Sequence, residues 1–108
     1  MIRDPLVFVW HIRDAIDLIE DFAKGTSKEK FLQDKLIQSG VVRQLEIIGE
    51  ASKNIPSEFK TKYPEIPWNR IAGMRDKLTH QYFGVNYDLV WQVIKNSLPK
   101  LKKQILEI

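Results

Sequence analysis

The chain has 108 residues, of which 44% are hydrophobic and 29% are charged; this excludes an intrinsically disordered chain and is ordinary for a globular protein. The length suits a single domain, which we assign to residues 1–108. The net charge of +3 is unevenly spread, because residues 1–54 hold 8 basic and 9 acidic side chains whereas residues 55–108 hold 9 and 5. The basic half suits an anionic partner such as nucleic acid, although an uneven solvated surface explains the charge equally well.

The sequence contains no cysteine, which excludes disulfides, thiol nucleophiles and thiolate zinc sites. Its two histidines, His11 and His80, are too far apart to form a ligand-spaced pair. We therefore expect no bound metal and no cofactor. No apolar run approaches the roughly 20 residues of a membrane helix, and the N-terminus lacks the pattern of a signal peptide. These features predict a cytoplasmic protein without a membrane span.

Two helices are predicted before residue 35. Asp4 is placed to cap the first helix, and Gly25 is placed to end it. Between them apolar residues recur at steps of three and four, which predicts one buried face. Thr26 and Glu29 have the spacing of a capping box, so a second helical piece should begin there with Phe31 and Leu32 facing inward.

A long helix is predicted over residues 35–54, with an apolar face that includes Leu36. Gly40 and Gly49 lie inside it and each costs about 1 kcal/mol relative to alanine, so we expect them to allow close approach of a neighbouring segment. Three charged residues spaced to pair along another face are Arg43, Glu46 and Glu50.

Prolines divide the second half of the chain. A short helix is expected over residues 57–63, and the next helix should begin at Pro67 and continue until Gly84 ends it. Asn86 is placed to cap a last helix, which Pro99 should kink or break. No segment shows the alternation of a strand or the signal of a hairpin. The expected fold is all-α, a four- to five-helix up-down bundle.

The densest chemistry lies within residues 75–82, which we call the motif segment. Arg75 is a permanent cation that binds phosphate through a planar fork of donors. His80 titrates near neutral pH and can accept or donate a proton. In one continuous helix these two residues would be separated by about 140° in projection, whereas Asp76 and His80 would share a face. From spacing alone, a solvated helix end with a dipole-complementing cation is the more frequent explanation.

Cleavage of RNA by its own 2′-hydroxyl requires a base, an acid and cations near the phosphorus oxygens. The motif segment of one chain contains only one histidine, His80. A two-fold dimer that aligns two motif segments would supply two histidines and two arginines in one cleft. The residues therefore favour a homodimeric site. Lys77 and Arg70 are placed to guide RNA, although exposed helix charges usually have no specific role.

The motif segment is similar to a known family signature. The run Arg75-Asp76-Lys77-Leu78-Thr79-His80-Gln81-Tyr82 resembles the R-x4-H-x-Y signature of HepT-like toxins, which belong to the HEPN superfamily of small helical RNases. Other segments that resemble the family are residues 45–51, 63–68, 71–75 and 82–85, with Val90-Trp91 and Leu98-Pro99. The resemblance extends over essentially the whole chain.

The resemblance implies a homodimeric helical bundle whose paired motifs line a cleft and cut RNA, such as tRNA or mRNA, without a metal. Arg75 and His80 would form the catalytic pair, with Asp76 and Thr79 in supporting positions. Asparagine is commonest in the family where this chain has Asp76. The carboxylate here would either favour protonation of His80 or weaken phosphate binding.

The resemblance also implies a partner. Tyr82 matches the tyrosine to which a minimal nucleotidyltransferase antitoxin, MntA-like, attaches AMP in a type VII-like toxin–antitoxin pair. The added phosphate would block an anion site by charge and bulk. The alternative that remains open is a non-catalytic nucleotide- or substrate-binding subunit of a two-component nucleotidyltransferase.

Overall fold

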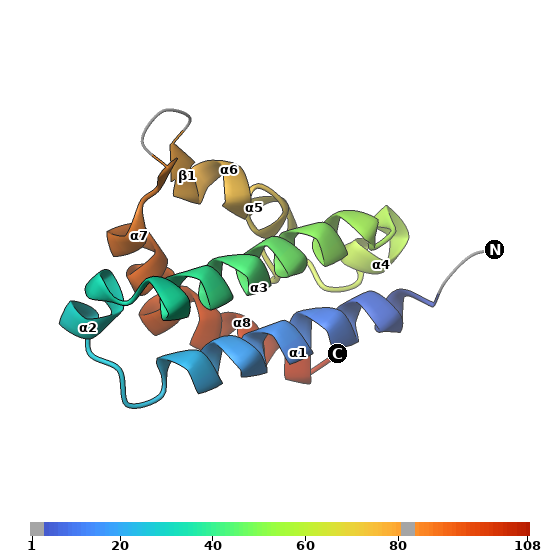
Figure 1. Ribbon diagram of the computed structural model, residues 1–108. Coiled ribbons are helices and arrows are strands. Elements are labelled where there is room, and N and C mark those ends of the chain that lie inside the picture. The colour runs from blue at the N-terminus through green and yellow to red at the C-terminus, as the bar shows by residue number, and fades with distance from the viewer. Residues whose placement is uncertain (1–3, 81–83) are drawn as a thin grey trace.

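The computed structural model describes residues 4–80 and 84–108 (Figure 1). The fold is all-α, as predicted from the sequence, apart from a very short antiparallel sheet of β1 (Thr79–His80) and β2 (Gly84–Val85) that the sequence did not predict. The helices are, in chain order, α1 (Pro5–Ala23), α2 (Lys28–Gln33), α3 (Lys35–Asn54), α4 (Ser57–Thr61), α5 (Trp68–Ala72), α6 (Met74–Leu78), α7 (Tyr87–Gln92), the π-helix η1 (Val93–Ser97) and α8 (Leu98–Leu106).

The two long helices α1 and α3 run antiparallel, and α8 lies behind them in the view of Figure 1. α5 and α6 lie along the other side of α3, so the last third of the chain wraps around this central helix. Apolar side chains from all of these helices meet in one core. Among its most completely buried members are Ile12, Ile16, Ile19, Val41, Ile48, Val90 and Leu98. None of the described helices is long and apolar enough to cross a membrane.

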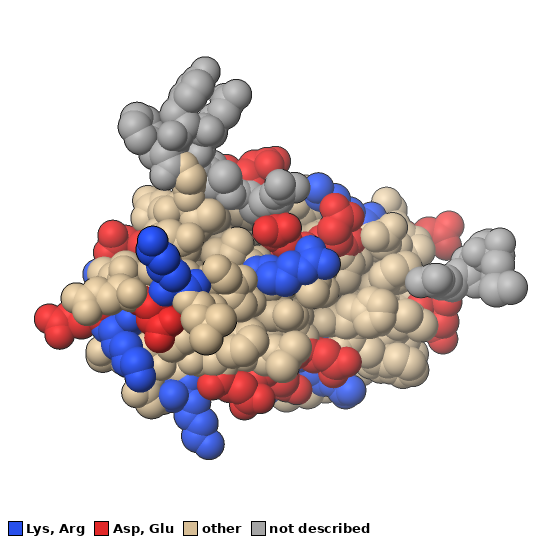
Figure 2. All heavy atoms as spheres, in the orientation of Figure 1, with Lys and Arg blue, Asp and Glu red and all other residues tan. Residues whose placement is uncertain are grey.

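Several large apolar side chains remain at the surface of α1 and α3. Trp10 is 49% exposed and Leu36 is 83% exposed, and Leu18 and Phe22 are also exposed. Figure 2 shows that uncharged side chains cover much of the surface over these two helices, with charged side chains gathered around them. Large exposed apolar side chains that lie together are typical of a surface that binds another protein chain.

The first two helices begin and end close to the predicted positions. The carboxylate of Asp4 accepts a hydrogen bond from the backbone N–H of Leu6, which confirms its predicted capping role. Gly25 follows the end of α1 with a φ of 72°, as predicted for a residue in the left-handed region.

The predicted capping box at Thr26 is wrong by one residue. Ser27 caps α2, because its Oγ accepts a hydrogen bond from the backbone N–H of Lys30 at 3.1 Å. Thr26 instead belongs to the turn that closes α1, where its backbone N–H donates to the Ala23 carbonyl at 2.9 Å.

The predictions that Leu32 and Leu36 face the core are also wrong, because both side chains are exposed. Phe31, the other residue of α2 predicted to face inward, is completely buried, which confirms that prediction. In α3 the buried residue of the first turns is Gln38, whose Nε2 donates to the Phe31 carbonyl at 2.9 Å. Leu36 lies two residues before Gln38, or about 200° around the helix, and therefore points away from the core.

The last helical region of the chain is continuous, because α7, η1 and α8 follow one another without a loop between them. The Asn86 side chain accepts a hydrogen bond from the backbone N–H of Leu89 at 3.1 Å, which confirms the predicted cap. Pro99 has no N–H to donate, and the helix before it widens into η1, where the backbone N–H of Leu98 donates to the Val93 carbonyl. The predicted interruption is therefore a π-helical turn that leads directly into α8.

Candidate functional site

The motif segment does not lie on one helix, contrary to the prediction of a single helix from Pro67 to Gly84. Gly73 separates α5 from α6, with φ −89° and ψ 5° outside the helical region. α6 then ends at Leu78, and the chain continues as a strand. Gly84 does not end a helix but opens the return strand β2 with a φ of 75°. The positive φ of Gly84 lies in the left-handed region that favours glycine, whereas the φ of Gly73 is open to any residue.

The backbone around His80 is held by two short strands. Thr79 is paired with Val85, and His80 is paired with Gly84. The backbone N–H of Asn86 also donates to the Leu78 carbonyl at 2.9 Å. These contacts join the end of α6 to the start of α7. The hairpin therefore holds the predicted histidine at the edge of the bundle.

The predicted site residues that the structure describes are therefore divided between two elements. Arg75 and Asp76 belong to α6, whereas Thr79 and His80 belong to β1. Tyr82 lies outside the described residues. Because the helix ends at Leu78, the helical spacing that separated Arg75 from His80 and placed Asp76 beside His80 no longer applies. The expected shared helical face of Asp76 and His80 is wrong for this reason.

The start of α5 is anchored to the last turn of α3 by a buried serine that sequence analysis overlooked. Ser52 is completely buried, and its Oγ donates a hydrogen bond to the Trp68 carbonyl at 3.3 Å. The indole Nε1 of Trp68 donates to the Tyr63 carbonyl at 3.0 Å. Trp68 is buried. The signal that could have indicated this anchor is a small polar residue at a core-facing position of α3.

The end of α5 also approaches α3 closely. A Cβ built on Gly49 would lie 3.4 Å from the Ile71 carbonyl oxygen and 3.7 Å from that of Ala72. The predicted role of Gly49 in close approach is therefore confirmed. Together with Ser52, this glycine sets the position of the segment that leads into Arg75.

Asp76 opens onto a charged hollow between α6 and α3. The hollow has a volume of about 290 Å³. The Arg43 guanidinium lies 3.8 Å from the Glu46 carboxylate, which confirms the predicted pairing along α3. The charged residues that line the hollow are Arg43, Glu46, Glu50, Lys53 and Asp76. Among the described residues that line the hollow, three carboxylates and two cations nearly balance, so these residues do not favour an anion.

Sequence analysis did not predict that Asp76 and residues of α3 line the same hollow. The residues of α3 that face this hollow lie at positions 43, 46, 50 and 53, and these steps of three and four mark one helix face. Among the described residues, no group of three or more histidine or carboxylate side chains is arranged to hold a metal ion.

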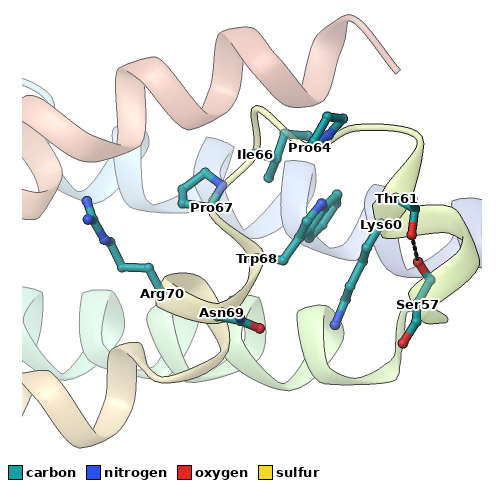
Figure 3. Close-up of a pocket in the computed structure, with 9 residues that line it drawn as sticks. All are labelled: Ser57, Lys60, Thr61, Pro64, Ile66, Pro67, Trp68, Asn69 and Arg70. Carbon is teal, nitrogen blue, oxygen red and sulfur yellow. Dashed lines mark hydrogen bonds between the residues drawn. The ribbon is translucent and has the colours of Figure 1, made fainter.

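A second, basic hollow lies on the other side of α5. It has a volume of about 560 Å³ and is lined by Lys60 from α4 and by Arg70 from α5. Figure 3 shows these two side chains on either side of Trp68. The remaining polar lining comes from Ser57, Thr61 and Asn69, and no carboxylate lines the described part of this hollow.

Comparison with known proteins identifies the family of this helical bundle. The family model described as "Ribonuclease HepT-like" matches residues 12–108, which include the motif segment. The chain belongs to the HepT-like ribonuclease family. It is 55% identical over 102 residues to a protein of Thermococcus cleftensis named "Probable ribonuclease HepT", and this match covers 94% of the chain and 93% of that relative.

Two further relatives have similar identity to this chain. A Caldanaerobacter subterraneus protein named "Putative RNase TTE0752" is 46% identical over 106 residues, covering 98% of this chain and 95% of the relative. A Methanocaldococcus jannaschii protein named "Gamma-glutamylcyclotransferase and putative RNase MJ0434" is 46% identical over 108 residues. The chain spans only 49% of that longer relative. No solved structure matches the chain.

Proposed function

We propose that this chain is the endoribonuclease toxin of a type VII-like toxin–antitoxin pair, acting on RNA in the cytoplasm without a metal. One observation carries the proposal: the chain belongs to the HepT-like ribonuclease family, and the arginine and histidine of its R-x4-H-x-Y motif, Arg75 and His80, fall on the adjoining elements α6 and β1. The R-x4-H-x-Y spacing and the basic second half of the chain support it.

The proposed reaction is cleavage by an internal hydroxyl. The ribose 2′-oxygen loses its proton to a base and bonds to phosphorus, and the bond from phosphorus to the 5′-oxygen breaks. An acid then protonates the departing 5′-oxygen, leaving a 2′,3′-cyclic phosphate and a 5′-hydroxyl. His80 is proposed to transfer protons, and Arg75 to stabilise the charge on the phosphorus oxygens.

A homodimer completes this scheme, because base and acid are both needed and the motif segment holds one histidine. His80 of one copy would serve as base and His80 of the other as acid. The exposed apolar side chains on α1 and α3 support self-association in general terms.

The proposed antitoxin is a minimal nucleotidyltransferase. It would join the Tyr82 oxygen to the α-phosphorus of ATP and release pyrophosphate. The resulting AMP group would add negative charge and bulk next to a phosphate-binding motif. This part of the proposal rests on the position of Tyr82 in the motif segment.

The central test replaces His80 and Arg75 separately with alanine. We expect His80→Ala to slow RNA cleavage by about a hundredfold or more, since a proton-transfer group is lost. Arg75→Ala should slow it by about a hundredfold through lost charge stabilisation. Cleavage is measured on RNA in EDTA by the appearance of cyclic phosphate ends.

His11→Ala is the matched control, because His11 is the other histidine of the chain and is exposed on α1. It should cleave RNA at the parent rate. Parent-level cleavage by either motif variant would show that the catalytic assignment is wrong.

The second candidate is a non-catalytic subunit that binds nucleotide or substrate beside a nucleotidyltransferase. Asp76 supports the non-catalytic part of this candidate, because this exposed carboxylate of the motif segment shares a hollow with Glu46 and Glu50 and would repel the phosphodiester to be cleaved. In that case the purified parent would bind nucleotide together with its partner enzyme and leave RNA intact in the same assay.

A further inference from the structure

The basic hollow beside Trp68 adjoins another hollow on the same face. The second one has a volume of about 200 Å³, and the two share Pro67 and Arg70 in their linings. It continues past Lys77 and Leu78 at the end of α6. Together they form one groove, which we call the α4–α6 groove, from Lys60 to the last residue before β1.

The charges along this groove have one sign. Lys60, Arg70 and Lys77 line it, and among the described residues no carboxylate does. None of the three is in an ion pair within the part of the chain that the structure describes. Three unpaired cations along a groove are suited to an extended anion, such as a phosphodiester backbone.

The second hollow differs from the first because its walls are largely apolar. Met74, Leu89 and Val93 are half-buried there, so their exposed surface faces the hollow. Ser97 adds a hydroxyl, and both Val93 and Ser97 belong to the π-helix η1. π-Helical turns occur often at functional sites, because they change the shape of a helix locally.

Cations beside a small apolar hollow match the chemistry of single-stranded RNA. Its phosphates bind cationic side chains, and its unstacked bases bury their flat faces against apolar ones. The groove also ends at Leu78, directly before the strand that contains His80. A single-stranded RNA bound in the groove would therefore reach the backbone of the motif segment.

We infer that the α4–α6 groove binds single-stranded RNA next to the cleavage site, with phosphates on Lys60, Arg70 and Lys77 and one base in the hollow beside Ser97. This inference rests on the proposed function for the identity of the anion. It adds residues that hold the substrate without taking part in proton transfer.

The test measures binding separately from cleavage. The probe is a fluorescent single-stranded oligonucleotide of about a dozen nucleotides, 2′-O-methylated at every ribose so that it cannot be cleaved. Binding by the full chain is followed by fluorescence anisotropy at several salt concentrations. We expect Lys60→Gln with Arg70→Gln to weaken binding by about tenfold at low salt and to reduce the slope of log affinity against log salt by about 1.4.

The matched control is Lys30→Gln with Lys35→Gln, which changes the net charge equally. Lys30 lies in α2 and Lys35 at the start of α3, at the other end of the molecule from α4 in Figure 1. This control should retain parent affinity. An equal loss in both double variants would mean that only net charge matters, and the inference would be wrong.

Filling the hollow provides a second and independent variant. Ser97→Phe should weaken binding severalfold and leave the salt slope unchanged, because no charge is lost. Asn96→Phe is its control, since Asn96 is the exposed neighbour in η1 and does not line the hollow. Circular dichroism and the melting temperature verify that each variant is folded.

The outcomes separate this inference from the proposed function. If the groove variants bind the probe as the parent does, the inference fails even where RNA cleavage is intact. If the parent binds the probe through the groove but never cleaves RNA, the inference stands and the proposed function fails. A parent that ignores the probe and binds poly-glutamate through these cations would show that the groove serves an acidic peptide instead.

Discussion

At the scale of single residues, two glycines on α3 set how closely other segments approach it. A Cβ on Gly40 would lie 3.0 Å from Cε2 of Phe22, a side chain that is partly exposed and able to move. A Cβ on Gly49 would face the Ile71 carbonyl oxygen at 3.4 Å. Backbone cannot move aside as a side chain does, so Gly49 is the more restrictive position.

Gly49 should therefore tolerate alanine but not a long side chain. Gly49→Ala should leave stability nearly unchanged, because about 1 kcal/mol of gained helix propensity offsets a tight contact. Gly49→Leu should lower the free energy of unfolding by about 1–3 kcal/mol, since overpacking pushes α5 away from α3. Urea denaturation measures both.

Glu50→Leu is the control, because it places the same side chain on the exposed neighbour. It should change stability much less than Gly49→Leu. Equal effects of the two leucines would show that the approach of Ile71 to Gly49 is not restrictive.

At the scale of elements, the ends of helices decide where the functional segment lies. α6 stops at Leu78, and the hairpin of β1 and β2 replaces the helix that periodicity predicts. The apolar pattern of residues 68–78 is helical, but it contains no information on Thr79 and His80, which pair with the return strand. Helix ends depend on such contacts and on caps as much as on propensity.

The cap of α2 provides a direct test at this scale. Ser27→Ala should cost about 1 kcal/mol of stability, because the Lys30 backbone N–H loses its acceptor. Thr26→Ala is the control and should cost less stability. In the described part of the chain, the N–H of Lys30 donates to the side chain of Ser27 and not to that of Thr26. Thermal melts compare the two. A larger loss of stability for Thr26→Ala than for Ser27→Ala would show that Thr26 caps α2, as the sequence predicted.

At the scale of the whole molecule, charge is divided between faces. One side of α6 opens onto the balanced hollow around Asp76, and the other onto the basic α4–α6 groove. α8 is joined to α1 by Lys102, whose Nζ lies 2.9 Å from the Glu20 carboxylate and 3.5 Å from that of Asp17. The hydrogen bond to Glu20 raises the pKa of Lys102, so this exposed contact weakens only as alkaline pH passes that raised value.

The proposed dimer predicts how activity falls when subunits are mixed. If cleavage needs His80 from both copies, an equal mixture of parent and His80→Ala chains, exchanged by refolding together, should keep about a quarter of the parent activity. If each chain cleaved RNA without its partner, the mixture would keep about half of the parent activity. Light scattering confirms the size of the mixed species, and His11→Ala in place of His80→Ala should leave activity unchanged.

Much of this protein follows from its sequence alone, because local signals determine local structure. The apolar periodicity determines the all-α fold, and side-chain oxygens placed before a helix determine the caps at Asp4 and Asn86. The motif segment identified Arg75 and His80 by their residue types and spacing. Their catalytic role stays a prediction.

Only the tertiary structure decided which residues meet. It turned Leu36 outward, ended α6 at Leu78, and brought Lys60 and Lys77 into one groove through Arg70. The physical reason is the same in each case. A helix pattern specifies a face but not what packs against it, and a groove exists only where separate elements converge.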